Sequence, residues 1–232
     1  MISVIIPAAG QGKRFGAGKN KAVVLLAGKS ILERTVEAFS DIPDIGERII
    51  VVAPDEVAEI TEQAKSFPKS ETIKVVAGGA ERQYSIENAL SSVDSGAEIV
   101  LVHDGARPLI SRDVIHKLIM EVRESSAAIV AVPVKDTIKK VDANGFVVDT
   151  PRRSELWAIQ TPQGFSRDLI INAYKRARED NFLGTDDASL VERMGVSVKI
   201  VQGEYENIKI TTPEDLPIAN LFLERRKRKE QQ

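Results

Sequence analysis

Short apolar runs alternate with amphipathic segments along most of this chain. Five runs rich in β-branched residues have the length of strands, at 4–6, 48–53, 73–77, 99–103 and 128–134. Such runs are typical of strands that are buried on both faces of a parallel sheet. Strands that alternate with helices form right-handed βαβ units. The pattern therefore predicts an α/β fold with a mostly parallel, twisted sheet and helices on both faces.

Helices are expected wherever apolar residues recur every three or four positions. Ser30 and Glu33 form a capping box before the first of them. Ser111 caps a later helix, whose apolar stripe is Val114, Ile115, Leu118, Ile119 and Val122. Further helices are expected at 81–93, after Ser166, at 186–194 and after Thr212, and two late strands at 196–201 and 208–210.

The alternation breaks between residues 135 and 160. Two strand-like segments within 137–150 flank Asn144-Gly145, which is the strongest short hairpin signal. Many of its positions are polar, so we expect the hairpin to project from the sheet. A projecting hairpin exposes strand edges, which favours a partner. We therefore expect one domain, residues 1–232, with a dimerisation arm at about 137–155. A hairpin folded back on its own domain is the alternative.

Composition narrows the classes of function. The 232 residues are 43% apolar, and the net charge of −2 disfavours a general nucleic-acid binder. No segment approaches the roughly 18 apolar residues of a membrane helix, and the first apolar run lacks the charged flank of a signal peptide. The absence of cysteine excludes a thiolate nucleophile and fits a reducing cytoplasm. Two distant histidines, His103 and His116, disfavour a histidine zinc site and a Ser-His-Asp triad.

The most informative segment is residues 7–21, directly after the first predicted strand. It contains four glycines, which let the backbone approach a ligand closely, and four cations. Exposed amides with fixed positive charge suit an anion that carries several phosphates. A solvated basic turn is the alternative.

Two familiar phosphate loops do not match this segment. The dinucleotide fingerprint needs glycine at the first, third and sixth positions, but counting from Gly10 the sixth residue is Phe15. The Walker loop needs a glycine five residues before Gly28-Lys29-Ser30, where Val23 stands. The segment is therefore neither of these two loops, and its two alanines and its long run down to Lys21 need another explanation.

Polar clusters also follow three later strands, at 78–85, 104–108 and 135–137. In open α/β sheets, ligands bind beyond the carboxyl ends of the strands, so these clusters are expected to meet. Ser85 could bond a base edge or its own helix backbone. Asp104 could meet a magnesium ion or only begin a turn. Arg107 could bind a nearby acid or a phosphate.

The segments together resemble a known family. In order, the chain contains Pro-Ala-Ala-Gly-x-Gly-x-Arg, Asn-Lys, Gly-Gly-x-Glu-Arg, His-Asp-Gly-Ala-Arg-Pro, Pro-Val-x-Asp-Thr, Trp-x-x-Gln-Thr-Pro-Gln, Thr-Asp-Asp-Ala-Ser and Asn-Ile-Lys-x-Thr-x-Pro-Glu-Asp-Leu. From Val4 to Leu216, this resembles the 2-C-methyl-D-erythritol 4-phosphate cytidylyltransferases of non-mevalonate isoprenoid biosynthesis. The resemblance implies a Rossmann-like nucleotidyltransferase that transfers CMP from CTP to methylerythritol phosphate and releases pyrophosphate.

The resemblance also implies roles for individual residues. Nucleotide contacts would come from Ala8, Ala9, Gly10, Gly12, Gly79, Ser85, Asp104 and Gly105. Arg14 and Lys21 would stabilise the charge that grows at the α-phosphate, and Asp104 would bind Mg²⁺ or another divalent cation. The sugar phosphate would be bound by Arg107, Thr137, Arg153, Thr161, Thr185 and Lys209, with Arg153 and Lys209 positioning its phosphate. Some of these residues would come from the arm of a second subunit, which favours a homodimer.

Three alternatives stay open at this point. A ribitol 5-phosphate cytidylyltransferase would share the fold and the chemistry. A NAD-dependent oxidoreductase is opposed by the glycine spacing at Phe15. A nucleotide-binding regulator without activity would not need the second group of cations, Arg153 and Lys209. Within the loop, Lys19 is the rival of Lys21 as the catalytic lysine, and Tyr84 departs from the family pattern near the cytosine pocket.

Overall fold

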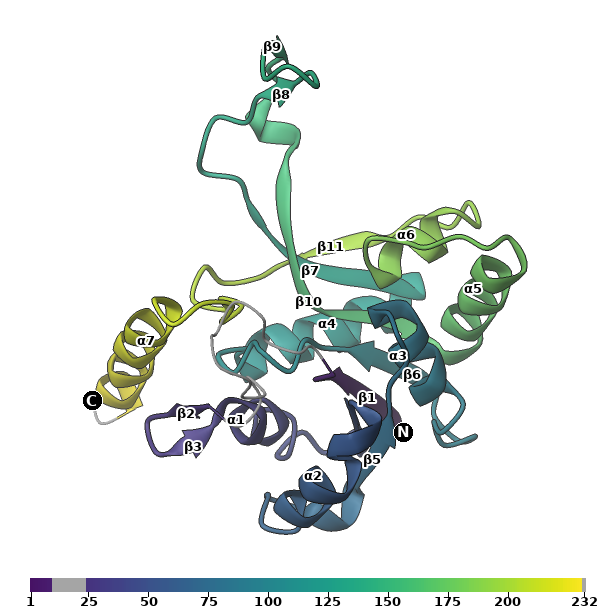
Figure 1. The fold of residues 1–232 in the computed structure, drawn as a ribbon, viewed down its shortest axis with the longest axis vertical. Coiled ribbons are helices and arrows are strands. Elements are labelled where there is room, and N and C mark those ends of the chain that lie inside the picture. Colours follow the sequence, from purple (N-terminus) through teal and green to yellow (C-terminus); the bar gives the residue numbers. More distant parts are fainter. Residues whose placement is uncertain (10–23, 231–232) are drawn as a thin grey trace.

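A mixed, mostly parallel sheet forms the centre of the protein (Figure 1). The computed structural model describes residues 1–9 and 24–230. In sheet order, the strands are β11 (Lys199–Gln202), β7 (Ala127–Pro133), β10 (Trp157–Ser166), β6 (Ile99–Val102), β1 (Ile2–Pro7), β4 (Ile45–Val52) and β5 (Ile73–Ala77). The five strands expected from the apolar runs are all present, which confirms the predicted α/β fold.

The strand β10 is the exception to the parallel pattern, because it runs antiparallel to both of its neighbours, β6 and β7. The sequence analysis did not predict it. Its ten residues include Pro162 and Gly164, and its pairing with β7 shifts register between Ile159 and Gln163. Proline and glycine are typical of irregular strands. Here they interrupt the apolar pattern from which a strand would be predicted. By contrast, the strand predicted at 208–210 is wrong, because these residues form no strand.

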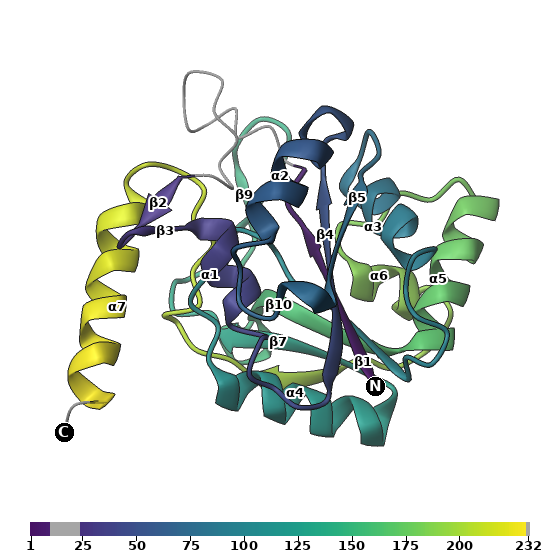
Figure 2. The same ribbon diagram turned by 90° about the horizontal axis from the view of Figure 1, so that it is seen from below.

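Helices cover both faces of the sheet (Figures 1 and 2). Neighbouring strand residues point to opposite faces: Val4 and Ile6 belong to one apolar cluster, and Ile5 belongs to the other. The first cluster includes side chains of α1 (Ile31–Glu37), α2 (Val57–Ala64) and α4 (Arg112–Ser125). The second includes side chains of α3 (Arg82–Leu90), α5 (Arg167–Glu179) and α6 (Asp187–Glu192). The expected two-sided arrangement is therefore confirmed.

The predicted helices are also present, although the capping role expected for Ser166 is wrong: α5 begins directly after it, but its side chain makes no capping hydrogen bond. The Ser30 hydroxyl accepts the Glu33 N–H at 3.0 Å, and the Ser111 hydroxyl accepts the Val114 N–H at 3.4 Å. All five residues of the expected stripe on α4 are buried. At the last helix, α7 (Asp215–Glu230), the Asp215 carboxylate accepts the backbone N–H groups of Thr211 and Thr212.

A small third apolar cluster joins α7 to the body. It contains Leu26 of the short hairpin β2 (Leu25–Leu26) and β3 (Lys29–Ser30), and Ala219 of α7. Ile210 is fully buried in the same cluster, and its N–H donates to Ala106 O at 2.8 Å. The apolar residues near 208–210 therefore serve this cluster instead of the sheet, which is why they resembled a strand.

The arm stands out from the body between β7 and β10 (Figure 1). Its strands, β8 (Lys140–Val141) and β9 (Val147–Asp149), are antiparallel but shorter than expected. Gly145 has a φ of +86°, and the Asp142 carboxylate accepts the N–H groups of Asn144 and Phe146. The projecting hairpin is confirmed.

Candidate active site

Three loops at the carboxyl ends of β1, β5 and β6 pack against one another without space for larger side chains. A β-carbon at Gly105 would lie 3.1 Å from Ala8 Cβ, and one at Gly78 would lie 3.2 Å from Ala9 Cβ. The two alanines that precede the glycine-rich segment are therefore small because glycines of the neighbouring loops contact them. This packing brings the loops of residues 8–9, 78–85 and 104–107 to one edge of the sheet.

The loop after β5 is held by its own helix. The Gly79 N–H donates to Ser85 Oγ at 3.0 Å, and the Ser85 hydroxyl donates to Glu81 O at 3.0 Å. Ser85 thus makes the backbone contacts that were the alternative to base binding. A hydroxyl oxygen has two lone pairs, so one acceptor position remains. The expected contacts of Gly79 and Ser85 with cytosine stay predictions.

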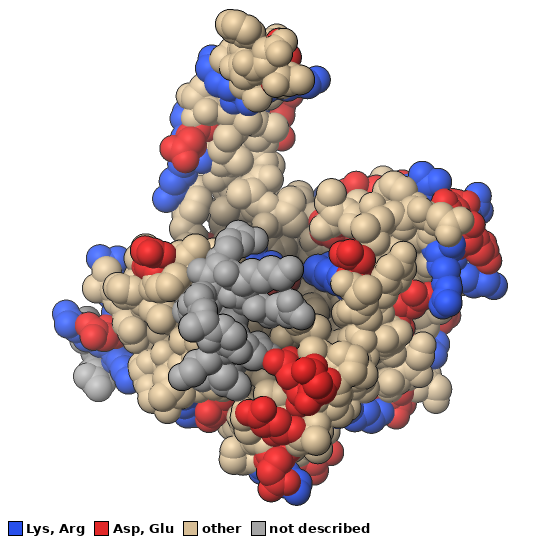
Figure 3. All heavy atoms as spheres, viewed as in Figure 1, with Lys and Arg blue, Asp and Glu red and all other residues tan. Residues whose placement is uncertain are grey.

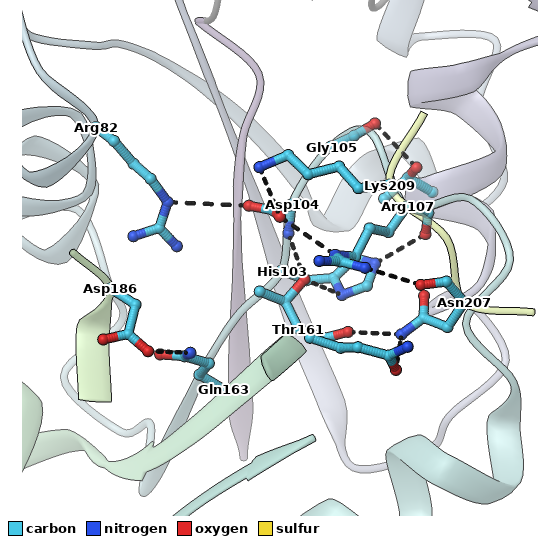
Figure 4. A network of polar contacts seen from close by, with 12 residues as sticks. Arg82, His103, Asp104, Gly105, Arg107, Thr161, Gln163, Asp186, Asn207 and Lys209 are labelled. Carbon is cyan, nitrogen blue, oxygen red and sulfur yellow. Dashed lines mark hydrogen bonds and ion pairs between the residues drawn. The ribbon is translucent and has the colours of Figure 1, made fainter. Parts of the chain in front are cut away.

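Asp104 lies at the centre of a cluster of cations (Figure 4). Its Oδ2 atom is 3.0 Å from Lys209 Nζ and 3.3 Å from Arg107 Nε. On the other side, Oδ1 is 3.9 Å from Arg82 Nε. The carboxylate is 10% exposed, while the Lys209 side chain is 43% exposed. One buried carboxylate therefore faces three cations from three different segments of the chain.

The charge balance of this cluster is positive, and it keeps Asp104 ionised. Burial raises the pKa of Asp104, but the charges of Lys209, Arg82 and Arg107 outweigh it and lower the pKa to about 2. Figure 3 shows Lys and Arg atoms in the hollow beside the undescribed residues, with Asp and Glu gathered below it. Excess positive charge at the carboxyl ends of parallel strands suits a phosphorylated ligand.

A buried histidine holds the backbone of the Asp104 turn. His103 is fully buried, and burial lowers its pKa to about 4 despite hydrogen bonds that raise it. The neutral ring donates from Nε2 to Arg107 O at 3.0 Å, so Nδ1 accepts the Thr161 hydroxyl at 3.2 Å. Thr161 Oγ in turn accepts the Asp104 N–H at 3.0 Å. Thr161 therefore connects β10 to the turn that carries Asp104.

Asn207 fixes the segment that carries Lys209. Its Nδ2 donates to Gln160 Oε1 at 3.1 Å and to Thr161 O at 2.9 Å, and its backbone carbonyl oxygen accepts Arg107 Nη1 at 2.8 Å. Asn207 is fully buried, so these bonds are shielded from water. Lys209 and Arg107, far apart in the sequence, are thereby held on the same side of Asp104.

The sequence analysis missed the second strong ion pair of the site. Arg82 Nη2 is 2.6 Å from Asp187 Oδ2, and Nη1 is 3.2 Å from Oδ1. Asp187 is fully buried and also accepts the Tyr174 hydroxyl, so burial together with the Asp187 charge raises the pKa of Tyr174 well above its usual value. The signal was present, because Arg82 lies in the Gly-Gly-x-Glu-Arg motif, but nothing local indicated its partner.

The remaining predicted substrate residues are divided between body and arm. Thr185 is exposed just before α6. Thr137 and Arg153 are exposed on the arm, where Arg153 Nη1 donates to Lys135 O at 2.9 Å. Within this one chain, the structure therefore brings Arg107, Thr161 and Lys209 together at Asp104 but places Thr137 and Arg153 on the arm.

Several predicted nucleotide residues lie outside the described residues: Gly10, Gly12, Arg14 and Lys21, together with the rival Lys19. The described part of the chain contains no group of three or more metal-ligating side chains. Mg²⁺ commonly binds one or two carboxylates plus substrate phosphates, so a lone Asp104 fits a metal that phosphate oxygens also hold. Residues 1–9 and 24–230 include no helix that is long and apolar enough to cross a membrane.

The fold is that of α/β nucleotidyltransferases. A solved 4-diphosphocytidyl-2C-methyl-D-erythritol synthase from Anaerococcus prevotii is similar, with a TM-score of 0.85 and 36% identity over 96% of each chain. The 2-C-methyl-D-erythritol 4-phosphate cytidylyltransferase of Thermus thermophilus has a TM-score of 0.78 and 33% identity, over 95% of this chain and 97% of its own.

Sequence comparison defines the family within this class. The family profile IspD, 2-C-methyl-D-erythritol 4-phosphate cytidylyltransferase, matches residues 2–225. Enzymes of that name from Caldanaerobacter subterraneus and Bacillus mycoides are 49% and 50% identical over 223 residues, which are 96% of this chain and 98% of each relative. The chain belongs to the 2-C-methyl-D-erythritol 4-phosphate cytidylyltransferase family, as its motifs indicated.

The cation cluster predicts a pH-dependent loss of stability in Asp104→Asn. The carboxylate stabilises the fold only while it is ionised, so its contribution is complete above about pH 4 and is lost as the pH falls towards 2. The lowered pKa corresponds to about 2 kcal/mol. Urea unfolding should show the variant less stable by about that amount at pH 7, with the difference disappearing near pH 2.

Asp44→Asn is the matched control. Asp44 pairs with Arg123 at 3.0 Å, but both side chains are about half exposed, 50% and 46%. Its loss should cost under about 0.5 kcal/mol at any pH. An Asp104→Asn difference that stays constant from pH 7 to pH 2 would contradict the charge argument.

Proposed function

We propose that this protein transfers CMP from CTP to 2-C-methyl-D-erythritol 4-phosphate. A phosphate oxygen of the sugar phosphate attacks the α-phosphorus of CTP, the new phosphorus–oxygen bond forms, and the bond to pyrophosphate breaks. The observation that carries the proposal is the Asp104 cluster. There, Lys209, Arg107 and Arg82 concentrate positive charge at the carboxyl ends of the parallel strands. Two polyanions that repel each other need such charge in order to meet.

The nucleotide is proposed to occupy the three packed loops. Ala8, Ala9, Gly79, Ser85, Asp104 and Gly105 would contact it, together with Gly10 and Gly12. The close packing of the loops supports this assignment, because Gly78 and Gly105 are buried against the two alanines while Gly79 stays exposed at the same edge of the sheet, where a flat base can approach its backbone. Arg14 and Lys21 would stabilise the charge that develops on the α-phosphate and on the leaving pyrophosphate.

The sugar phosphate is proposed to bind next to the cluster. Lys209 is 43% exposed, so its ammonium can turn from Asp104 towards a phosphate. The Thr161 hydroxyl proton already bonds His103, so Thr161 would accept a hydrogen bond from a hydroxyl of the sugar. Arg107 and Thr185 would lie at the edges of the same site, and Arg153 and Thr137 would complete it.

Magnesium, or another divalent cation, is proposed to accompany the triphosphate. Asp104 would hold it together with phosphate oxygens, and the ion would neutralise charge on the nucleotide. The cations that surround Asp104 favour a metal that arrives with phosphates, because a bare dication would be repelled.

Arg153 and Thr137 support a homodimer in which the arm of one chain completes the site of the other. Both residues stand on the arm, away from the Asp104 cluster. Five apolar side chains are exposed there: Ile138, Val141, Phe146, Val147 and Val148. An apolar surface of this kind favours a protein partner.

In a cysteine-free chain no step needs an oxidising compartment, and we propose that the reaction takes place in the cytoplasm.

Ribitol 5-phosphate is the alternative acceptor, because the same chemistry and cations would serve it. The purified protein with CTP, MgCl₂ and either sugar phosphate should release pyrophosphate much faster with methylerythritol phosphate.

Replacement of CTP by ATP or GTP should nearly abolish turnover, since a wrong base leaves buried hydrogen-bonding groups unpaired. Comparable rates with ATP, or faster turnover of ribitol phosphate, would refute the assignment. Nucleotide binding without any turnover would indicate a regulator.

Arg14→Ala and Lys21→Ala should each lower kcat about a hundredfold, with smaller changes in KM for CTP. A cation aimed at the α-phosphate binds the transition state more tightly than the ground state, and one such group is worth on the order of 3 kcal/mol. Lys209→Ala should chiefly raise KM for the sugar phosphate. If Lys21→Ala kept its kcat while Lys19→Ala lost it, Lys19 would be the catalytic lysine.

Subunit complementation should test the shared site. At a sugar-phosphate concentration well below the raised KM, Arg153→Ala and Lys209→Ala should each be nearly inactive as homodimers. If the arm of one chain serves the other, a heterodimer of the two variants has one intact site, so an equal mixture should recover about a quarter of wild-type activity. No recovery after subunit exchange would contradict the arrangement.

Sedimentation should report the same interface. Phe146, 70% exposed on the arm, and Met120, 56% exposed on α4, are comparable apolar side chains. Phe146→Asp should shift the protein towards monomers, whereas Met120→Asp should leave the dimer intact. A wild-type monomer at micromolar concentration would overturn the dimer proposal.

A further inference from the structure

We infer that Gln83, with Arg82, is a positioning residue for the loop that carries Thr185. The inference rests on the proposed function, in which Thr185 binds the sugar phosphate. Residues 181–186 form no helix or strand between α5 and α6, so side chains from elsewhere hold them. The two neighbouring residues that do so begin α3, directly after the loop assigned to the nucleotide.

Gln83 holds the loop from both ends of its side-chain amide. Its Nε2 donates to Phe182 O at 3.0 Å, and its Oε1 accepts the Gly184 N–H at 2.9 Å. The side chain is buried, so neither bond is exchanged freely with water. Gln83 therefore holds the backbone of Gly184, the residue directly before Thr185.

Arg82 holds the other side of Thr185. Its two-pronged pair with Asp187 is shielded, because Asp187 is fully buried and also accepts the Tyr174 hydroxyl. A planar guanidinium on a carboxylate fixes direction as well as distance. Thr185 thus lies between the Gly184 backbone N–H and the Asp187 carboxylate, which are both held by the start of α3.

Gly184 also helps to fix the position of the loop that carries Thr185. A β-carbon there would lie 2.5 Å from Ser189 Oγ and 2.7 Å from Leu190 Cδ2. At Gly184 the loop therefore packs closely against the first turn of α6. From β10, Gln163 adds bonds to Asp186 Oδ2 at 2.8 Å and to the Ala188 N–H at 2.9 Å.

The functional consequence is that the nucleotide loop and the sugar-phosphate loop share one support. Residues 79–85 are proposed to bind CTP, and Arg82 and Gln83 in the same stretch position Thr185 for the second substrate. Both ends of the Gln83 amide bond to the backbone of residues 182 and 184, so Gln83 acts on the sugar phosphate through the loop and not by contact.

A double-mutant cycle tests this on the affinity for methylerythritol phosphate, measured as KM beside kcat and KM for CTP. Gln83→Ala should raise KM for methylerythritol phosphate about tenfold, since two buried hydrogen bonds are lost, with KM for CTP little changed. In a Thr185→Ala background, the same change should cost almost nothing more, because the residue that it positions is gone. Equal costs in both backgrounds would overturn the inference, as would a Thr185→Ala variant with unchanged KM.

Hydrogen exchange separates this inference from the proposed function, because it needs no substrate. The Gly184 amide should exchange at least tenfold faster in Gln83→Ala than in the wild type. Unchanged protection would overturn the positioning role even if the enzyme turns over. Absence of turnover by the wild-type protein would instead refute the proposed function.

Two further variants guard against misinterpretation. Gln83→Glu keeps the acceptor for the Gly184 N–H but loses the donor to Phe182 O, so it should fold and show an intermediate rise in KM. Arg178→Gln removes another tie between α3 and α5, the 3.0 Å pair with Glu87, which does not involve residues 182–187. It should change neither exchange at Gly184 nor KM, and an effect equal to that of Gln83→Ala would contradict a role specific to the loop.

Discussion

The stability and the chemistry of this site both depend on keeping one nearly buried carboxylate ionised. Asp104 loses most of its contact with water, and that loss alone would favour its neutral form. Lys209, Arg107 and Arg82 reverse this preference, and each reaches Asp104 from a different part of the chain. The fold must therefore bring the C-terminal segment, the β6 turn and the start of α3 to one point. Once assembled, the cluster has more positive than negative charge and is ready for phosphates.

A second layer of neutral hydrogen bonds makes this arrangement rigid. His103, Thr161 and Asn207 donate to or accept from the backbone around Asp104 and Lys209 and carry no charge themselves. Hydrogen-bonded neutral groups can be buried at lower cost than ions, which would need partners of their own. In this layer the Asn207 Oδ1 atom is buried and has no hydrogen-bond partner in the described part of the chain. The charged groups thus lie at the carboxyl ends of the parallel strands, and the neutral groups hold the backbone segments that carry them.

The sequence predicted those parts of the molecule that depend on local pattern. The strands of the parallel core and the stripe of α4 follow from residues that are neighbours in the chain. Strand β10 could not be predicted in this way, since Pro162, Gly164 and the polar residues Gln160, Thr161 and Gln163 interrupt its apolar pattern. Among the residues of the site, Asp104, Arg107 and Lys209 could be selected from the sequence, because they follow a strand or belong to a recognisable motif. Arg82 could not be given a role, because its partner Asp187 is distant in sequence and only the fold brings them together.

The place of β10 in the sheet has a consequence for the order of folding. β7 does not lie beside β6, which precedes it in the chain; the gap between them is filled by β10, which is made later. During synthesis, β1, β4, β5 and β6 can pair as they emerge, but β7 has no permanent neighbour until residues 157–166 have followed. The nascent chain must therefore hold β7 without a neighbouring strand in the meantime, while the strands of the arm pair only with each other. The contacts of the Asp104 turn are completed only from that point on, because Thr161 lies in β10 and Lys209 follows it, so the Asp104 cluster forms after β1, β4, β5 and β6 can have paired.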